Sequence, residues 1–196
     1  MKEKEEIARL RKAIKKLQSQ KRYEHTLGVE FTAASLAMRY GASIREARLA
    51  GLLHDCTKCL SEEKQLTYCK KHAISITETE RRNPFLLHAK TGACIATEKY
   101  GIQNNEIINA IRHHTTGRPQ MSLLEKILFV ADYIEPNRTT APVADLKEIR
   151  RLAFVDLDQA VRRILKGTLE YLRTSGKEID TITEVTYAYY CENAAK

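Results

Sequence analysis

Residues 51–59 read GLLHDCTKC, and two overlapping metal-binding patterns occupy this stretch. His54 and Asp55 pair an imidazole with a carboxylate, whereas Cys56 and Cys59 have the C-x-x-C spacing of zinc and redox motifs. Adjacent residues on a helix point about 100° apart, so His54 and Asp55 can reach one ion only where a helix ends. The following CTKC is typical of such an end. The stretch therefore predicts a helix that delivers polar side chains to the interior as it ends.

Outward from this stretch, apolar residues recur at steps of three and four along most of the chain, which indicates helices. Ser43 with Glu46 and Ser122 with Glu125 have the spacing of capping boxes, Ser61 begins another helix, and Asn83 is a cap followed by a proline at the first helical position. Glycines and prolines mark the helix ends. The predicted helices comprise residues 7–17, a second helix that holds His25 and ends at Gly41, residues 43–54, a short helix from Ser61, residues 83–101, about 105–114, 122–136, and 158 to about 173.

The last segment, residues 177–195, is ambiguous. Its β-branched and aromatic residues favour a strand, whereas Thr181 and Glu184 have the spacing of a helix cap. The chain shows no repeat and no Pro/Gly linker. We therefore predict an all-α fold, a single helical bundle, in which a basic helix at residues 1–19 packs on a domain formed by residues 20–196.

The composition is that of a globular protein, with 196 residues, 43% hydrophobic and 30% charged. The longest run without Asp, Glu, Lys or Arg is eight residues, whereas a membrane helix needs about 18. Five cysteines, an odd number, and an N-terminus without an apolar core region favour the reducing cytoplasm over secretion. We expect a cytoplasmic protein with no membrane partner.

The formal charge of +8 is concentrated at one end. Residues 1–22 contain nine Lys/Arg and three Glu, so they carry +6 of it. Such a run is usually a solvated helix face, although it could also bind an acidic partner. Because the rest of the chain is nearly neutral, a uniformly basic surface for nucleic acid is not indicated.

Several histidines and aspartates fall on the apolar faces of the predicted helices. His25 lies four residues before Val29, and His114 lies three after Ile111, whereas its neighbour His113 points to another side. Taken singly, such a residue is usually a satisfied core side chain. The full inward set comprises His25, His54, Asp55, His88, His114 and Asp132.

Four imidazoles and two carboxylates would together leave many buried polar groups to satisfy. A divalent cation with nitrogen and oxygen ligands satisfies several of them at once, and iron, manganese and zinc all accept such ligands. No comparable partners exist for the C-x-x-C pair, since Cys69 follows Cys59 by ten residues without a second pair. We therefore interpret Cys56 and Cys59 as ordinary residues of a turn.

The pattern His25, His54-Asp55 and Asp132 resembles the HD-domain metal-dependent phosphohydrolases. Within these, four segments resemble the YqeK-like family of symmetrical bis(5'-nucleosyl)-tetraphosphatases. They are KRYEHTLGVE (21–30), ARLAGLLHDCTK (47–58), NPFLLHAKTGA (83–93) and IRHHTTGRPQMSLLEKILFVADYIEPNR (111–138). The HD dipeptide alone is a weak signal, but the spaced series of segments is specific. The resemblance implies a single HD-domain helical bundle.

The resemblance implies a role for each matching residue. His25, His54, Asp55 and Asp132 would hold iron, as one or two ions, with manganese or another divalent cation as alternatives. His88 and His114 would face the substrate phosphates or ligate a second ion. Arg22, Lys58 and Arg138 would contact the phosphates, and Asp55, Lys58, His88 and His114 would form the catalytic group.

The substrate that the resemblance implies is diadenosine tetraphosphate, cleaved in the middle to two ADP by a metal-activated water. Four negative phosphates need cations along their length, and Arg22, Lys58 and Arg138 provide them. We expect His88 or His114 to protonate or orient the leaving diphosphate.

Two other functions are compatible with the sequence. One is an HD phosphohydrolase that acts on a nucleoside mono- or triphosphate or on a guanosine alarmone. The other is a non-enzymatic module that binds RNA or a protein through its basic first helix. Tyr187, Tyr189 and Tyr190 are interpreted as core or interface residues rather than as base-stacking residues. The sequence leaves the oligomeric state open, and a homodimer is one option.

Overall fold

The computed structural model describes residues 3–139 and 146–193. These residues form eleven α-helices and one 3-10 helix, and they contain no strand, which confirms the all-α prediction. The helices are α1 (Glu3–Lys15), α2 (Gln20–Tyr40), α3 (Ile44–Leu53), α4 (Glu62–Lys71), α5 (Glu78–Arg82), η1 (Pro84–Leu87), α6 (His88–Glu98), α7 (Asn105–His113), α8 (Leu123–Ile134), α9 (Leu146–Ala153), α10 (Leu157–Thr174) and α11 (Thr181–Glu192).

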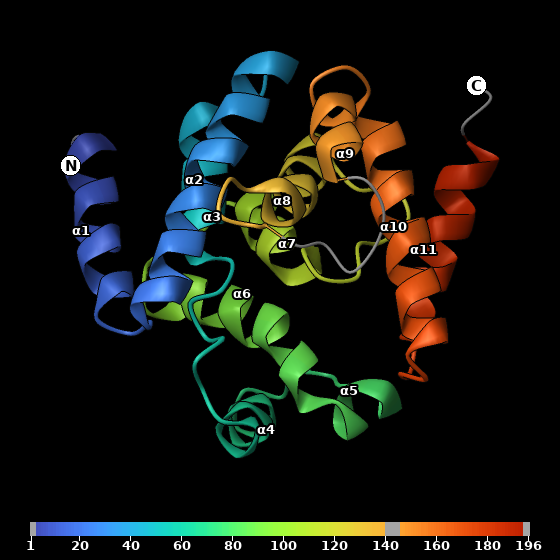
Figure 1. Ribbon diagram of the computed structural model, residues 1–196. Coiled ribbons are helices and arrows are strands. Elements are labelled where there is room, and N and C mark those ends of the chain that lie inside the picture. The colour runs from blue at the N-terminus through green and yellow to red at the C-terminus, as the bar shows by residue number, and fades with distance from the viewer. Residues whose placement is uncertain (1–2, 140–145, 194–196) are drawn as a thin grey trace.

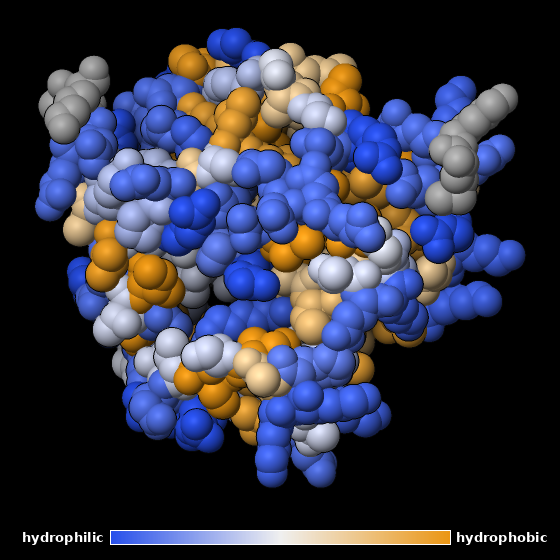
Figure 2. Space-filling view, turned by 180° about the vertical axis from the view of Figure 1, so that it is seen from behind, coloured by the Kyte–Doolittle hydropathy of each residue, from blue (hydrophilic) through white to orange (hydrophobic). Residues whose placement is uncertain are grey.

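The apolar helix α8 lies in the middle of the bundle (Figure 1), and it packs against α2, α3, α7 and α10. The helices α1 and α11 lie on opposite sides of the molecule, and α4 to α6 form its lower part in this view. Figure 2 shows the opposite face, where hydrophobic residues form small separate groups and hydrophilic residues border a central hollow. Among the residues described, no helix is both long and apolar enough to cross a membrane.

The contact between α2 and α3 brings two predicted ligands together. Gly51 lies directly against α2, and a Cβ atom placed there would come within 2.8 Å of the Glu30 Cα. Real Cβ atoms essentially never come so close to a neighbouring backbone, so this crossing requires glycine. Since His54 follows Gly51 by one helical turn, the close crossing carries its ring toward His25 on α2.

The first helix is anchored by three buried residues, Ile7, Leu10 and Ile14. Leu17, which was predicted to continue this face, lies beyond the end of α1 and is 44% exposed. The helix ends at Lys15 and the chain turns before α2 begins, so the periodicity does not extend that far. Part of the basic charge of α1 is internal, because Arg11 forms an ion pair with the buried carboxylate of Glu30. Residues 1 and 2 of the predicted N-terminal unit lie outside the described part.

Several predicted helix starts are confirmed by their caps. The hydroxyls of Ser43, Ser61 and Ser122 each accept a hydrogen bond from a backbone amide of the first turn. Ser122 and Glu125 complete the predicted capping box. The carboxylate of Glu46, predicted to complete a box with Ser43, instead accepts a hydrogen bond from the Asn104 amide.

Other boundaries differ from the predictions. The proline after Asn83 begins a 3-10 turn rather than an α-helix, the Asn83 side chain does not cap it, and α6 begins only at His88. Residues 181–192 form the helix α11 and not a strand, and Asp180 rather than Thr181 supplies the cap. Tyr190 is buried, as expected of a core residue, whereas residues 194 and 195 lie outside the described part.

Candidate metal centre

The first half of the candidate metal centre joins α2, the end of α3 and α8. The Nε2 atom of His25 lies 3.3 Å from the Nε2 atom of His54 and 3.1 Å from Oδ1 of Asp132. His54 is the C-cap residue of α3, and Asp55 follows it in a turn. The predicted helix end is therefore confirmed. The Asp55 Oδ2 atom lies 3.5 Å from the His54 Nε2 atom.

The second half joins the start of α6 to the end of α7. The Nε2 atoms of His88 and His114 lie 3.2 Å apart. The other carboxylate oxygen of Asp55, Oδ1, lies 3.3 Å from the His88 Nε2 atom and 3.7 Å from that of His114. Asp55 therefore stands between the two halves, with one oxygen directed at each. The structure brings together all six polar side chains that were predicted to face inward.

The tautomers of these histidines are set by the backbone. The Nδ1 atoms of His54, His88 and His114 lie 2.6–2.7 Å from the carbonyl oxygen three residues earlier, which only an N–H can satisfy. In the neutral form of each ring the Nε2 atom therefore carries a lone pair. Such a backbone contact is the usual way to orient a metal-ligating histidine.

Lone pairs on buried Nε2 atoms that face one another repel unless a cation lies between them. His54 is fully buried, and the side chain of Asp55 is only 4% exposed. Three overlapping groups in this cluster could each hold a metal ion, and each of Asp55, His54 and His114 belongs to two of them. Nitrogen and carboxylate donors suit iron, manganese and zinc. The residues present therefore fit a divalent cation.

Sequence reasoning missed a buried carboxylate behind this cluster. Glu135 accepts a hydrogen bond from Nδ1 of His25 at 3.2 Å and another from the backbone amide of Asn137 at 2.7 Å. Gly28 provides the space, since a Cβ atom there would come within 2.4 Å of the Glu135 carboxylate. The available signal was the spacing of three residues from Asp132, which places both acids on one side of α8.

The predicted phosphate-binding cations surround the cluster. Arg22 donates to Asp55 Oδ2 at 2.7 Å, and Arg138 contacts Asp132 Oδ1 at 3.4 Å. The Lys58 ammonium lies 3.2 Å from the ring nitrogens of His88. Both arginines line a cleft of about 470 Å³, and His25 forms part of its wall. The cleft therefore borders the candidate metal centre at His25.

The electrostatics match this arrangement. Burial alone would raise the pKa of Asp55, but the charge of His54 and the hydrogen bonds to His114 and His54 lower it well below its usual range. Burial, together with the neighbouring His114 and Lys58, lowers the pKa of His88 to about 3. Burial also lowers the pKa of the Lys58 ammonium. At neutral pH the Asp55 carboxylate is therefore ionised and the His88 ring is neutral.

The cysteines of the opening stretch do not join the cluster. The Cys56 thiol is buried and donates to the carbonyl oxygen of Gly92 at 3.7 Å, whereas Cys59 is exposed. Neither is in a disulfide. In the described residues, the groups that could hold a metal include neither of them. This agrees with their interpretation as turn residues around Lys58.

Comparison with known proteins places this fold and site in a class. The HD domain matches residues 22–137, a span that holds every predicted ligand. A solved structure described as a predicted HD superfamily hydrolase involved in NAD metabolism, from Clostridium acetobutylicum, superimposes with a TM-score of 0.90. The two are 36% identical, and the match covers 94% of this chain and 96% of that one.

Two curated relatives are named "Bis(5'-nucleosyl)-tetraphosphatase, symmetrical". The one from Bacillus subtilis is 40% identical, over 89% of this chain and 91% of its own length. The one from Halalkalibacterium halodurans is 41% identical, over 85% and 87%. The chain therefore belongs to the HD-domain family and, within it, to the family of the symmetrical bis(5'-nucleosyl)-tetraphosphatases.

Proposed function

We propose that this protein hydrolyses diadenosine tetraphosphate symmetrically to two molecules of ADP, using a divalent cation. The observation that carries the proposal is the convergence of four histidine Nε2 atoms and two carboxylates beside a cationic cleft. The names of the relatives indicate the substrate. They favour it over simple nucleotides and over a non-enzymatic binding module.

We propose iron as the ion, held by His25, His54, Asp55 and Asp132. The nitrogen and oxygen donors support iron or manganese, and the family resemblance favours iron. Asp55, with His88 and His114, could hold a second ion, since its two oxygens face the two halves. When bound, the ion supplies positive charge near the phosphates and lowers the pKa of a water molecule.

The arginines have a second task once a cation is present. Arg22 and Arg138 now pair with Asp55 and Asp132. With Asp55 and Asp132 engaged as ligands, the two guanidinium groups would be released to contact the phosphates in the cleft. Guanidinium suits this task because it donates two parallel hydrogen bonds to phosphate oxygens.

The reaction needs a water oxygen at one inner phosphorus and departure of the oxygen that bridges the two inner phosphates. Each of the two inner phosphorus atoms becomes the terminal phosphorus of one ADP, and protons are released. Because His88 is neutral at neutral pH and keeps its Nδ1 proton on the Phe85 carbonyl, it is suited to orienting a group rather than to donating a proton. Lys58, which touches its ring, is the nearby cation for the leaving phosphate.

The test is product chromatography over a panel of nucleotides. We expect diadenosine tetraphosphate to give ADP as its only nucleotide product. In ¹⁸O-labelled water, one ADP of each pair should carry a single labelled oxygen. Free phosphate or pyrophosphate from nucleoside mono- or triphosphates, with the tetraphosphate left intact, would overturn the proposal in favour of another phosphohydrolase.

The ion is tested separately, by metal analysis of protein purified without added metal. We expect iron in the parent protein and its loss in Asp55→Ala. Iron in the parent but no cleavage of any dinucleoside polyphosphate would reject the substrate and keep the metal centre. If the purified protein contained another metal and were fully active, the assignment of iron would be rejected and the rest of the proposal would stand.

Three further predictions concern partners and location. The protein is expected in the cytoplasm, nucleic acid is not expected as a partner, and a homodimer is an option. Three exposed lysines at the end of α1 allow a test of the binding-module alternative without removing the buried face of this helix. They are Lys12, Lys15 and Lys16. Alanine at all three should leave hydrolysis intact, and loss of RNA binding would support the module.

A further inference from the structure

The candidate metal centre described above is called the HD centre from here on. A second cluster of possible ligand atoms lies away from it, between the end of α4 and the helix α6, which also carries His88 of the HD centre. His72 follows the end of α4, while Cys94 and Glu98 lie one turn apart on α6. The Nδ1 atom of His72 lies 2.8 Å from Oε1 of Glu98. One ligand atom from each of the three residues lies within 4.8 Å of the others. The spacing of four residues places the thiol and the carboxylate on one face of α6.

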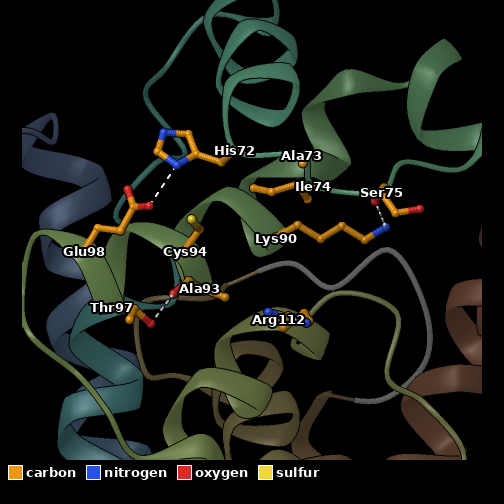
Figure 3. A pocket seen from close by; sticks show the side chains of 10 residues that line it. All are labelled: His72, Ala73, Ile74, Ser75, Lys90, Ala93, Cys94, Thr97, Glu98 and Arg112. Carbon is orange, nitrogen blue, oxygen red and sulfur yellow. Dashed lines mark hydrogen bonds and ion pairs between the residues drawn. The ribbon is translucent and has the colours of Figure 1, made fainter.

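This cluster forms one wall of a cavity of about 550 Å³ that is separate from the cleft of the HD centre. Figure 3 shows the Cys94 sulfur and the Glu98 carboxylate directed to the same side of α6 as the His72 ring. The side chain of His72 is 18% exposed and that of Glu98 is 47% exposed. A small ion can therefore reach the three ligand atoms from solvent.

The donor set is that of a zinc site with an open position. Imidazole, thiolate and carboxylate are the three ligand types that zinc accepts, and sites with three protein ligands keep a fourth place for water or another ligand. Two ligand atoms about 2.0–2.1 Å from a tetrahedral ion lie roughly 3.4 Å apart. The His72–Glu98 contact must therefore lengthen from 2.8 Å by about 0.6 Å, which the exposed Glu98 side chain allows.

Tyr68 contacts all three proposed ligands, since its hydroxyl also lies 3.8 Å from the Sγ atom of Cys94. Its ring stacks on the His72 ring, with centroids 4.1 Å apart and an angle of 19° between the planes. Its hydroxyl donates to Oε2 of Glu98 at 2.8 Å, which leaves Oε1 directed at His72. Supporting contacts of this kind orient metal ligands and raise their affinity.

The surrounding charges are compatible with zinc. Thiolate and carboxylate together offset the two positive charges of the ion. Burial raises the pKa of the Cys94 thiol, so a bound metal must displace its proton, as metals do at other thiols. Lys90, the nearest lysine of the cavity, is occupied by Glu80 at 2.7 Å. Arg112 lies on the far wall, where it favours an anionic fourth ligand over a neutral one.

We propose that His72, Cys94 and Glu98 bind one Zn²⁺ ion between α4 and α6, with a fourth position open to the cavity. The competing interpretation is that these three side chains and Tyr68 are joined by hydrogen bonds and an ion pair alone, with no metal bound. The two interpretations differ in whether the Cys94 sulfur bonds to a metal.

Cobalt(II) tests this directly, because a thiolate ligand gives it an intense near-ultraviolet charge-transfer band that nitrogen and oxygen ligands do not give. The metal-loaded enzyme, kept reduced and free of oxygen, is titrated with Co²⁺. We expect one equivalent to produce the band and one equivalent of Zn²⁺ to remove it. Cys94→Ser should abolish the band, whereas Cys191→Ser, which changes an exposed cysteine on α11, should keep it.

Two further variants separate ligands from support. Glu98→Gln should weaken Zn²⁺ binding more than Tyr68→Phe does, and Tyr68→Phe should weaken it by roughly 10–100-fold, as for other residues that orient a ligand. Hydrolysis of the tetraphosphate and the circular dichroism spectrum report that each variant is folded. Absence of the band in the parent, or a band that survives in Cys94→Ser, would overturn the proposal.

Discussion

Two adjacent histidines at the end of α7 belong to different clusters. His113 is the last residue of the helix and His114 is its C-cap. His113 contacts the Glu125 carboxylate at the start of α8, at 2.9 Å, whereas His114 enters the HD centre near the other end of α8. Both clusters combine imidazole with a buried carboxylate. The helical period already separates the two side chains, since neighbours diverge by about 100°.

The clusters differ in what compensates their negative charge. Glu125 receives two hydrogen bonds from the guanidinium of Arg118, at 2.7 and 2.6 Å, and another from the backbone amide of Ser122. Protein donors therefore compensate the negative charge of the Glu125 carboxylate. In the HD centre, Arg22 and Arg138 contact Asp55 and Asp132, whereas the Nε2 atoms of His25 and His54 face one another at 3.3 Å, with lone pairs that only a cation or a proton can satisfy. A histidine–carboxylate contact thus indicates a metal only where protein donors do not complete it.

The largest effect is expected from Asp55→Ala. Because this carboxylate serves both halves of the HD centre, the variant should lose its bound metal. Its kcat/KM for the tetraphosphate should fall by at least about 1000-fold, as loss of several kcal/mol of charge stabilisation implies. Metal analysis and steady-state kinetics measure both. Asp158→Asn, an exposed carboxylate on α10, is the matched control and should change neither. Retained metal and activity in Asp55→Ala would contradict the proposed centre.

In the other cluster, Glu125→Gln should reduce stability and leave metal content unchanged. Burial alone would raise the pKa of Glu125, but the hydrogen bonds from His113 and Arg118 lower it to about 2 from an ordinary 4.5. At about 1.4 kcal/mol per pKa unit, the carboxylate contributes about 3 kcal/mol at neutral pH. Urea unfolding of the parent and the variant at pH 7 measures this difference.

The pH dependence of that difference has a fixed sign. Because the pKa of Glu125 is lowered in the folded protein, its contribution is complete above about pH 4.5 and is lost as the pH falls toward 2. The gap between parent and Glu125→Gln should therefore narrow below pH 4.5. Glu148→Gln, which breaks a pair with Arg151 at the surface, should reduce stability much less than Glu125→Gln does. If the difference in the free energy of unfolding between the parent and Glu125→Gln stayed constant with pH, the charge of Glu125 would not be the source of its stabilising effect.

An intermediate effect is expected from Glu135→Ala, behind His25. Loss of a carboxylate that orients a ligating histidine should weaken metal binding by roughly 10–100-fold. Excess metal should restore most of the activity. Glu135→Gln keeps an oxygen that can accept from the His25 Nδ1 proton, so its metal affinity should fall less. Equal affinities for the parent and both variants, measured by competition with a chelator, would remove Glu135 from the metal centre.

The smallest effect is expected from Arg138→Ala, at the edge of the cleft. Loss of a half-exposed guanidinium should raise KM for the tetraphosphate by about tenfold and leave metal content unchanged. Arg138→Lys keeps the charge without the paired donors and should fall between the parent and the alanine variant. The control is Arg163→Ala, an exposed arginine on α10, for which KM should not change. An unchanged KM in Arg138→Ala would exclude this phosphate contact.

Local signals predicted most of the fold. The capped helices α3, α4 and α8 begin where Ser43, Ser61 and Ser122 were expected to cap them, because a cap depends on residues within one turn. The short helices α5 and α9 were missed, since five and eight residues show too little of a period. The C-terminal helix was ambiguous because its β-branched residues favour a strand locally, while packing against α10 decides for a helix.

The sequence by itself determined which polar residues face the interior, because helical phase depends only on spacing. His25, His54, His114 and Asp132 were assigned inward on that basis, and the structure places them within one cluster. What only the tertiary structure decided is which atoms meet: the division of Asp55 between two groups, the role of Glu135 behind His25, and the second cluster of His72 with Cys94 and Glu98. These contacts join residues from different helices, and their distances depend on how closely the helices cross, as at Gly51.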